Sequence, residues 1–128
     1  MHSYVVLVAK PGRQLDPRLI AALDQPDHPD LAFWPEGHLL WRDRSERVVV
    51  AGWQTGVDVF DLGSHWHHDD RGLTAFTRHL WPKGGMWDAG ETWASQLHRR
   101  LEGTSPARAV EDLGGVFTAL TVDRDGRG

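Results

Sequence analysis

The sequence predicts a single α+β domain in which helices pack against antiparallel sheets. Apolar, β-branched runs separated by turn residues fill the first half of the chain and return at its end, and two helical patterns lie between these regions. The length of 128 residues is sufficient for one domain with its own hydrophobic core, so we expect one domain spanning residues 1–128.

The first predicted elements are a strand and a short helix. Residues 3–9 form a continuous apolar run, which is typical of a strand buried on both faces. Asp16 and Pro17 have the pattern of a helix N-cap followed by proline at the first helical position, and they predict a helix over residues 18–23. The segment 25–30 contains two prolines and two aspartates, which predicts a loop.

The next region, residues 31–59, predicts mainly β-structure. Two apolar runs, 38–42 and 47–53, flank the polar tetrapeptide 43–46, and this pattern predicts a hairpin with a four-residue loop. A further strand is expected over residues 73–77, because turn residues bound this apolar run on both sides.

A helix is expected to begin at Asp88 or Gly90. Trp93, Leu97 and Leu101 recur with helical spacing and would form its apolar face. A glycine two residues after the last of these positions is a natural C-terminal stop, so the helix should end close to it.

The end of the chain predicts a short helix, a strand and a turn. The Ser-Pro pair 105–106 is a capping pattern, and the glycine pair 114–115 is expected to separate this helix from a strand over residues 116–122. Residues 123–126 read Asp-Arg-Asp-Gly, and Asp-Gly after an apolar run predicts a hairpin turn. We expect the partner strand beyond residue 128, in a longer protein.

The composition argues against several classes of function. A formal net charge of -4 argues against nucleic acid as the main partner, since phosphate binding needs a basic face. The chain has no cysteine, which excludes disulfides, thiolate metal sites and a cysteine nucleophile within it. The sequence has no run of about twenty apolar residues, so it predicts no membrane-spanning helix. Its first residues also lack the basic region of a signal peptide. We therefore expect a cytoplasmic protein without a membrane partner.

Tryptophan is unusually frequent, with seven residues in this short chain. Trp81, Trp87 and Trp93 fall within one strand-to-helix connection. Tryptophan is a large amphipathic residue of cores and interfaces, so we expect these side chains to pack in the core or against another domain.

A histidine cluster, His-Trp-His-His-Asp-Asp, occupies residues 65–70. His65 and His67 lie on one side of an extended chain, and His68 with a neighbouring aspartate could complete a site for zinc or divalent iron or nickel. Because all of these residues are adjacent, a polar loop leading into the strand at residue 73 is the alternative interpretation. The other histidines are expected to be surface or capping residues: His2, His28, His38, His79 and His98.

The end of the chain also resembles a known family. Residues 105–126 read as a helix ending in leucine, a glycine pair, a Phe-containing apolar strand and a D-x-x-G turn. This order resembles a segment of asparagine synthetases. That segment lies in their N-terminal glutaminase domain, a glutamine amidotransferase of the N-terminal-nucleophile (Ntn) type. The resemblance implies an Ntn-hydrolase-like αββα sandwich, truncated here before its last strands.

The resemblance also implies that the glutaminase chemistry has been lost. Active family members begin Met-Cys-Gly, and the thiol of the processed N-terminus attacks the glutamine amide. His2 and Ser3 occupy that place here, and residues 75–79 replace the Asn-Gly-Glu run that builds the oxyanion hole. Glu91 opens the corresponding helix, where it could retain a substrate-binding role or simply stabilise the helix dipole.

Enzymes with such an altered N-terminus exist in the same superfamily, among them β-lactam synthetases and lasso peptide cyclases. The resemblance thus implies a non-catalytic domain of an ATP-dependent amide-bond-forming enzyme, with no cofactor in this chain. ATP and Mg would be bound by a C-terminal synthetase domain, and a peptide substrate and a homodimer are compatible with this reading. Two alternatives stay open: a stand-alone protein-binding domain with exposed tryptophans, and a metal hydrolase centred on the histidine cluster.

Overall fold

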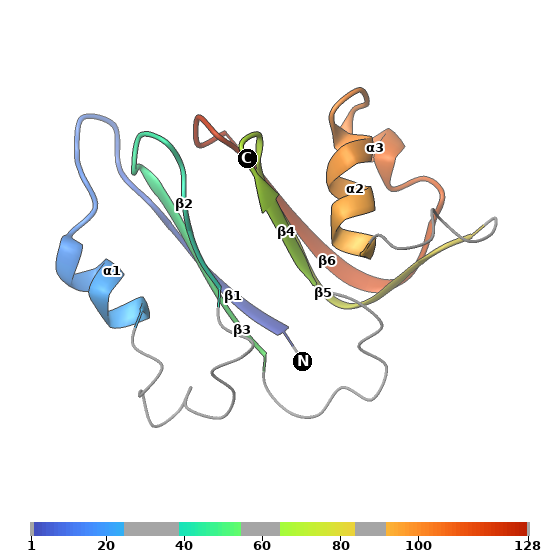
Figure 1. The fold of residues 1–128 in the computed structure, drawn as a ribbon, viewed down its shortest axis with the longest axis horizontal. Coiled ribbons are helices and arrows are strands. Elements are labelled where there is room, and N and C mark those ends of the chain that lie inside the picture. The colour runs from blue at the N-terminus through green and yellow to red at the C-terminus, as the bar shows by residue number, and fades with distance from the viewer. Residues whose placement is uncertain (1, 25–38, 55–64, 84–91, 128) are drawn as a thin grey trace. The chain divides into compact units, whose positions relative to one another are not determined.

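The computed structural model describes residues 2–24, 39–54, 65–83 and 92–127 (Figure 1). Within them lie two three-stranded antiparallel sheets and three helices, so the predicted α+β class is confirmed. The chain divides into two compact units, Met1–Asp58 with Val122–Gly128 and Val59–Thr121. The elements in chain order are β1 (His2–Val8), α1 (Pro17–Leu23), β2 (Leu39–Arg42), β3 (Val48–Gln54), β4 (Trp66–Asp69), β5 (Gly72–Pro82), α2 (Trp93–Leu101), α3 (Pro106–Ala109) and β6 (Leu113–Asp123).

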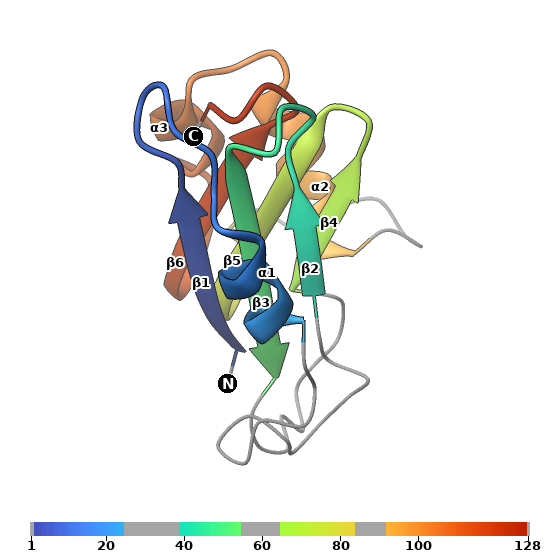
Figure 2. The ribbon, with the colours of Figure 1, turned by 90° about the vertical axis from the view of Figure 1, so that its left-hand side faces the viewer.

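The sheet of the first unit has the strand order β1-β3-β2 (Figure 2). The predicted hairpin is confirmed: β2 and β3 pair antiparallel, with Leu39 opposite Gly52. Asp43 closes the turn between them, since its Oδ1 accepts the Val48 N–H at 2.8 Å and its own N–H donates to the Val48 carbonyl at 3.1 Å. One aspartate therefore fixes the register at the start of the hairpin.

The prediction that the first strand is buried on both faces is wrong. β1 is an edge strand, and its Val5, Val6 and Val8 are 38%, 40% and 65% exposed. The central strand is β3, in which Val49 and Val50 are fully buried. Both strands are apolar and β-branched, so the local pattern alone does not distinguish the edge of this sheet from its centre.

The N-terminal helix α1 lies beside one face of this sheet (Figures 1 and 2). It begins at Pro17, and the predicted N-cap is confirmed because Asp16 Oδ1 accepts the Arg18 N–H at 2.9 Å. Ile20 is the buried residue of this short helix, whereas Leu19 is 54% exposed. The predicted loop at 25–30 lies outside the described residues.

The predicted turn at the end of the chain is confirmed. The Gly126 N–H donates to the Asp123 carbonyl at 3.0 Å, and the Asp123 N–H donates to the Arg127 carbonyl at 2.7 Å. Gly126 has φ +79°, a conformation that glycine adopts without a steric penalty. The Arg44 N–H donates to the Arg124 carbonyl at 2.9 Å, which joins this turn to the β2–β3 turn of the same unit.

The second unit is built on the sheet β4-β5-β6. Residues 66–69 form a strand that pairs antiparallel with β5, with Asp69 opposite Gly72, so the polar-loop interpretation of the histidine cluster is wrong. The predicted strand at 73–77 is the first half of β5. The glycine pair 114–115 lies inside β6 and does not precede it; Gly115 has φ +117°, which allows the strand to continue through it.

Helices α2 and α3 contribute to the core of this unit. Thr92 is the N-cap of α2, so the helix begins at Trp93, later than the expected Asp88 or Gly90. Ser105 caps α3 as predicted. Burial of a large apolar side chain is worth about 1.5–3 kcal/mol. Among the described residues of this unit, one buried apolar cluster contains Phe76, Leu80, Ala94, Leu97, Ala109 and Leu113.

The described helices are all short. Among the residues that the structure covers, no helix has the length and apolar character needed to cross a bilayer.

Candidate functional site

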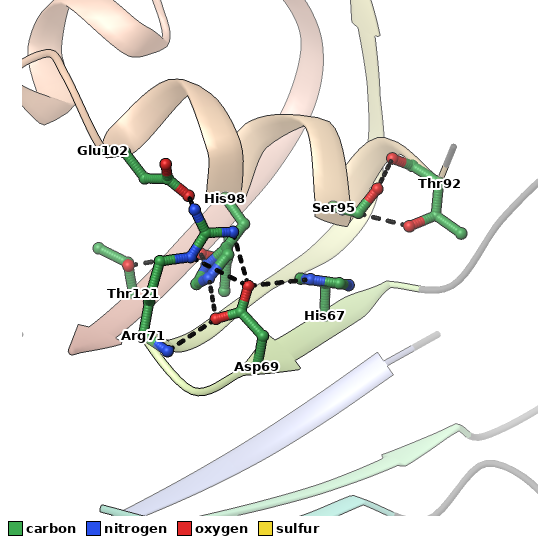
Figure 3. A network of polar contacts seen from close by, with 9 residues as sticks. His67, Asp69, Arg71, Thr92, Ser95, His98, Glu102 and Thr121 are labelled. Carbon is green, nitrogen blue, oxygen red and sulfur yellow. Dashed lines mark hydrogen bonds and ion pairs between the residues drawn. The ribbon is translucent and has the colours of Figure 1, made fainter. Parts of the chain in front are cut away.

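A polar network lies between the β4–β5 hairpin and helix α2 (Figure 3). Its central imidazole is His98, which is 6% exposed. Ala94, Leu97 and His98 share the buried face of α2 because they recur with a spacing of three and four residues. The Thr92 hydroxyl fixes the start of the helix by accepting the Ser95 N–H at 3.1 Å, and the helix then carries His98 inward toward the hairpin.

The carboxylate of the network is Asp69, at the end of β4. Its Oδ1 accepts the Arg71 N–H at 2.8 Å, a local turn that holds the carboxylate at the hairpin end. Gly72 follows with φ +151°, a backbone conformation that favours glycine. The Arg71 side chain returns to the same carboxylate, with Nη2 2.7 Å and Nε 3.2 Å from Oδ2. Arg71 Nη1 also forms an ion pair with Glu102, which follows α2.

His98 joins the hairpin to the centre of the sheet. Its Nε2 lies 3.0 Å from Asp69 Oδ1, and its Nδ1 lies 2.7 Å from the hydroxyl oxygen of the fully buried Thr74. Thr74 Oγ1 is in turn 3.4 Å from Thr121 Oγ1 on β6. An Asp–His–Thr–Thr chain of polar contacts therefore runs from β4 through α2 and β5 to β6.

The second imidazole, His67, lies on the same hairpin as Asp69. His67 Nε2 is 3.7 Å from Asp69 Oδ2, and the His67 and His98 rings have centroids 5.2 Å apart. One ligand atom from each of His67, Asp69 and His98 falls within 4.8 Å of the others. Two imidazoles and one carboxylate at this spacing could hold a transition-metal ion.

Electrostatics keep the site anionic at Asp69. The Arg71 guanidinium holds the pKa of Asp69 far below its ordinary value, helped by the Arg71 backbone N–H and by His98, although partial burial acts in the opposite direction. Asp69 in turn raises the pKa of Arg71. At neutral pH Asp69 is ionised, so its carboxylate accepts hydrogen bonds and donates none. The hydrogen between it and His98 is therefore carried by the imidazole Nε2.

A cavity of about 330 Å³ lies next to this network, between β5, β6 and the two helices of the unit. Leu97, Leu101 and Phe117 make its surface largely apolar, whereas Thr74 and Thr121 bring hydroxyl groups to it. Thr74 therefore belongs both to the cavity lining and to the hydrogen-bonded chain that ends at Asp69.

The structure brings together only part of the predicted cluster. His67 belongs to the network, whereas His65 is 5% exposed with its ring centroid 4.5 Å from that of Phe76, and His68 is exposed. Neither His65 nor His68 is among the three residues whose ligand atoms converge. The three-histidine metal set stays a prediction, and the described geometry favours another set.

The expectation that His98 is a surface or capping residue is wrong. Its position four residues after Ala94 and one after Leu97 would have placed it on the buried face, but this signal does not identify Asp69 and Thr74 as its partners. Glu91, His28 and His38 lie outside the described residues, as do the side chains of His2, Ser3 and His79.

No family model, curated protein or solved structure matches this chain. The described site offers a carboxylate anion, two imidazoles, a guanidinium and two threonine hydroxyls. These groups can link a hairpin to a helix, and the carboxylate and the two imidazoles can hold a cation.

Proposed function

We propose that this chain is a non-catalytic, glutaminase-like domain of an asparagine-synthetase-type, ATP-dependent amide-bond-forming enzyme, related to β-lactam synthetases or lasso peptide cyclases. The Ntn-type αββα arrangement is part of this proposal. The observation that carries it is β6 with the turn that follows, since the resemblance to the family rests on this segment.

The geometry of that turn explains why aspartate and glycine occupy the first and last positions of its D-x-x-G pattern. Asp123 Oδ1 accepts the N–H groups of Asp125 and Arg127, each at 2.9 Å, and the left-handed conformation of Gly126 completes the turn. An aspartate that caps the turn and a glycine three residues later are the two fixed positions of a D-x-x-G motif. This agreement supports the family resemblance at its strongest segment.

Two observations support the loss of glutaminase chemistry. The chain lacks the cysteine nucleophile, and His2 and Ser3 pair with Gln54 and Trp53 in a regular strand ladder. In place of the oxyanion-hole run, Phe76 lies within β5, where its N–H donates to the His65 carbonyl at 2.9 Å. A backbone N–H committed to a sheet is not free to stabilise a tetrahedral intermediate.

The proposal assigns the remaining chemistry to other parts of a cytoplasmic enzyme. A C-terminal synthetase domain would bind ATP and Mg and activate a carboxylate, and an amine of the substrate, such as a peptide, would replace ammonia. In this proposal the role of residues 1–128 is to support that domain, and a homodimer is compatible with it.

The test combines glutamine hydrolysis with labelling by a glutamine-analogue diazoketone, using purified chain whose N-terminus is verified by intact mass. We expect no ammonia release above the buffer blank and no covalent adduct. Turnover or adduct formation would contradict the non-catalytic assignment. Reading the gene past codon 128 tests the ligase part: an in-frame strand with D-x-x-G and a later S-G-G-x-D motif supports it, and a stop codon contradicts it.

The stand-alone alternative with exposed tryptophans gains no support from the side chains that the structure describes. Trp41 is 9% exposed, and Trp66 and Trp93 are partly buried. Trp93 packs against the core of the second unit, as expected.

A further inference from the structure

The geometry points to a divalent transition-metal site formed by His67, Asp69 and His98, with zinc as the best-matched ion. This site is independent of the amide-ligase proposal, because none of its three residues has a role in that chemistry. It differs from the three-histidine set expected from the sequence in two of its three members.

The distances between the ligand atoms suit one small ion. Zinc binds nitrogen and oxygen at about 2.0–2.2 Å, so two of its ligand atoms lie roughly 3–4 Å apart. Asp69 Oδ1 and His98 Nε2 are 3.0 Å apart, whereas the 3.7 Å contact of His67 Nε2 is with the other carboxylate oxygen, Oδ2. Closing the remaining separation, which is at most 4.8 Å, requires only a small movement of the half-exposed His67 ring.

The ligands come from two elements that are themselves fixed. His67 and Asp69 lie on the paired strand β4, and His98 lies on the buried face of α2. Ligands on separate, rigid elements hold the geometry of a metal site more precisely than adjacent residues of one loop do. An ion at this site would connect the hairpin to the helix through three ligand bonds.

An outer hydrogen bond already orients His98. A metal-bound histidine usually donates its other ring N–H to a fixed acceptor, and Thr74 Oγ1 lies 2.7 Å from His98 Nδ1. Without metal, Nε2–H donates to Asp69. With metal, the ion takes the Nε2 lone pair, the ring proton moves to Nδ1, and Thr74 changes from donor to acceptor.

Arg71 determines how strong such a site can be. Its guanidinium holds Asp69 Oδ2 at 2.7 Å and repels an incoming cation, whereas Glu102 offsets part of this charge. The ion would replace the His98 contact on Oδ1 and leave the Arg71 contact on Oδ2 in place. Three protein ligands leave at least one coordination position for water, so we expect weaker binding than at a closed four-ligand site.

The experiment is calorimetric titration of chelator-treated full chain with Zn²⁺, repeated with Co²⁺ to read its visible absorption. We expect one equivalent to bind the wild type and the H68A control, because the His68 side chain is exposed and lies outside the set. H67A and D69A should lose this stoichiometric binding, and T74V should weaken it by about 10–100-fold. H67A changes a partly exposed residue, so folding is expected to survive.

A second readout does not depend on affinity. Imidazole nitrogen NMR of His98 should move from the Nε2–H to the Nδ1–H form as zinc is added. No binding by the wild type, binding that survives in H67A, or loss that is equal in H68A would each overturn the site.

Discussion

His98 Nε2 and Asp69 Oδ1 are 3.0 Å apart, although 29 residues separate them along the chain. This contact ties the end of the β4–β5 hairpin to the buried face of α2. The Arg71–Glu102 ion pair makes a second link from the same hairpin to the C-terminal end of the same helix. The hairpin turn and the helix are thus fastened to each other at two points.

Removing the imidazole should destabilise the fold. H98A leaves Asp69 and the buried Thr74 without their shared partner, and we expect the free energy of unfolding to fall by about 1–3 kcal/mol. The measurement is urea denaturation of the metal-free chain. H68A is the control, because a change at this exposed histidine should remain within about 0.5 kcal/mol. Equal effects of the two variants would show that the His98 contacts contribute nothing.

Acid should weaken the network through Asp69. Its pKa is lowered in the folded state, so its contribution to stability is complete above the ordinary aspartate pKa of about 3.9 and is lost as the pH falls below it. The free energy of unfolding should therefore fall more steeply between about pH 5 and 2 in the wild type than in D69N.

Two features make this comparison specific. Asp43 also has a lowered pKa, since its contacts with Ser45 and Val48 outweigh the effect of burial, but this contribution is present in both proteins. D70N changes the neighbouring exposed carboxylate and should keep the wild-type pH profile. A D69N profile that matches the wild type would contradict the assigned role of Asp69.

Three glycine-to-alanine variants should separate backbone strain from steric contact. G103A meets no atom within 4 Å and should be neutral or stabilising by up to about 1 kcal/mol. G12A also meets no atom but has φ +72°, so it should cost about 1–2 kcal/mol. Gly126 has φ +79°, and a Cβ there would also lie only 2.9 Å from Asp43 Oδ2, so G126A should be the least stable of the three variants. Denaturation midpoints in any other order would contradict this geometry.

A fourth glycine, Gly52, leaves room for an aromatic ring across the sheet. A Cβ on Gly52 would lie 2.7 Å from Tyr4 Cδ1, and Tyr4 is its register partner on β1. G52A should therefore cost about 1–3 kcal/mol in the wild type. In a Y4A background the same change should cost at least about 1 kcal/mol less, which a double-mutant cycle measures. Additive effects would mean that the ring does not restrict this position.

The parts of the fold that sequence predicts correctly depend on short-range interactions. The β2–β3 hairpin depends on Asp43 bonding to Val48 five residues later, and the caps of α1 and α3 involve neighbours two and three residues away. Each of these hydrogen-bonding motifs lies within a few consecutive residues, so the local sequence predicts it.

The incorrect predictions concern interactions between distant segments. Whether β1 lies at an edge is decided by which strands pair with β3, and its composition resembles that of β3 itself. Residues 66–69 are polar, yet pairing with β5 makes them a strand. The sequence predicts a surface position for His98 and not its network, because its partners, Asp69 on β4 and Thr74 on β5, lie on other elements. Strand pairing overrides local propensity in the first two cases, and in the third the partners of His98 cannot be read from its own helix.

The division of the chain has a consequence for synthesis on the ribosome. Val59–Thr121 is one continuous segment, so the second unit can finish folding soon after its last residue emerges. The first unit needs Val122–Gly128, and the bond from Arg44 to Arg124 cannot form until those residues are made. Of these two units, the one that is translated first is therefore completed last, and its exposed strand edge must remain unaggregated during that delay.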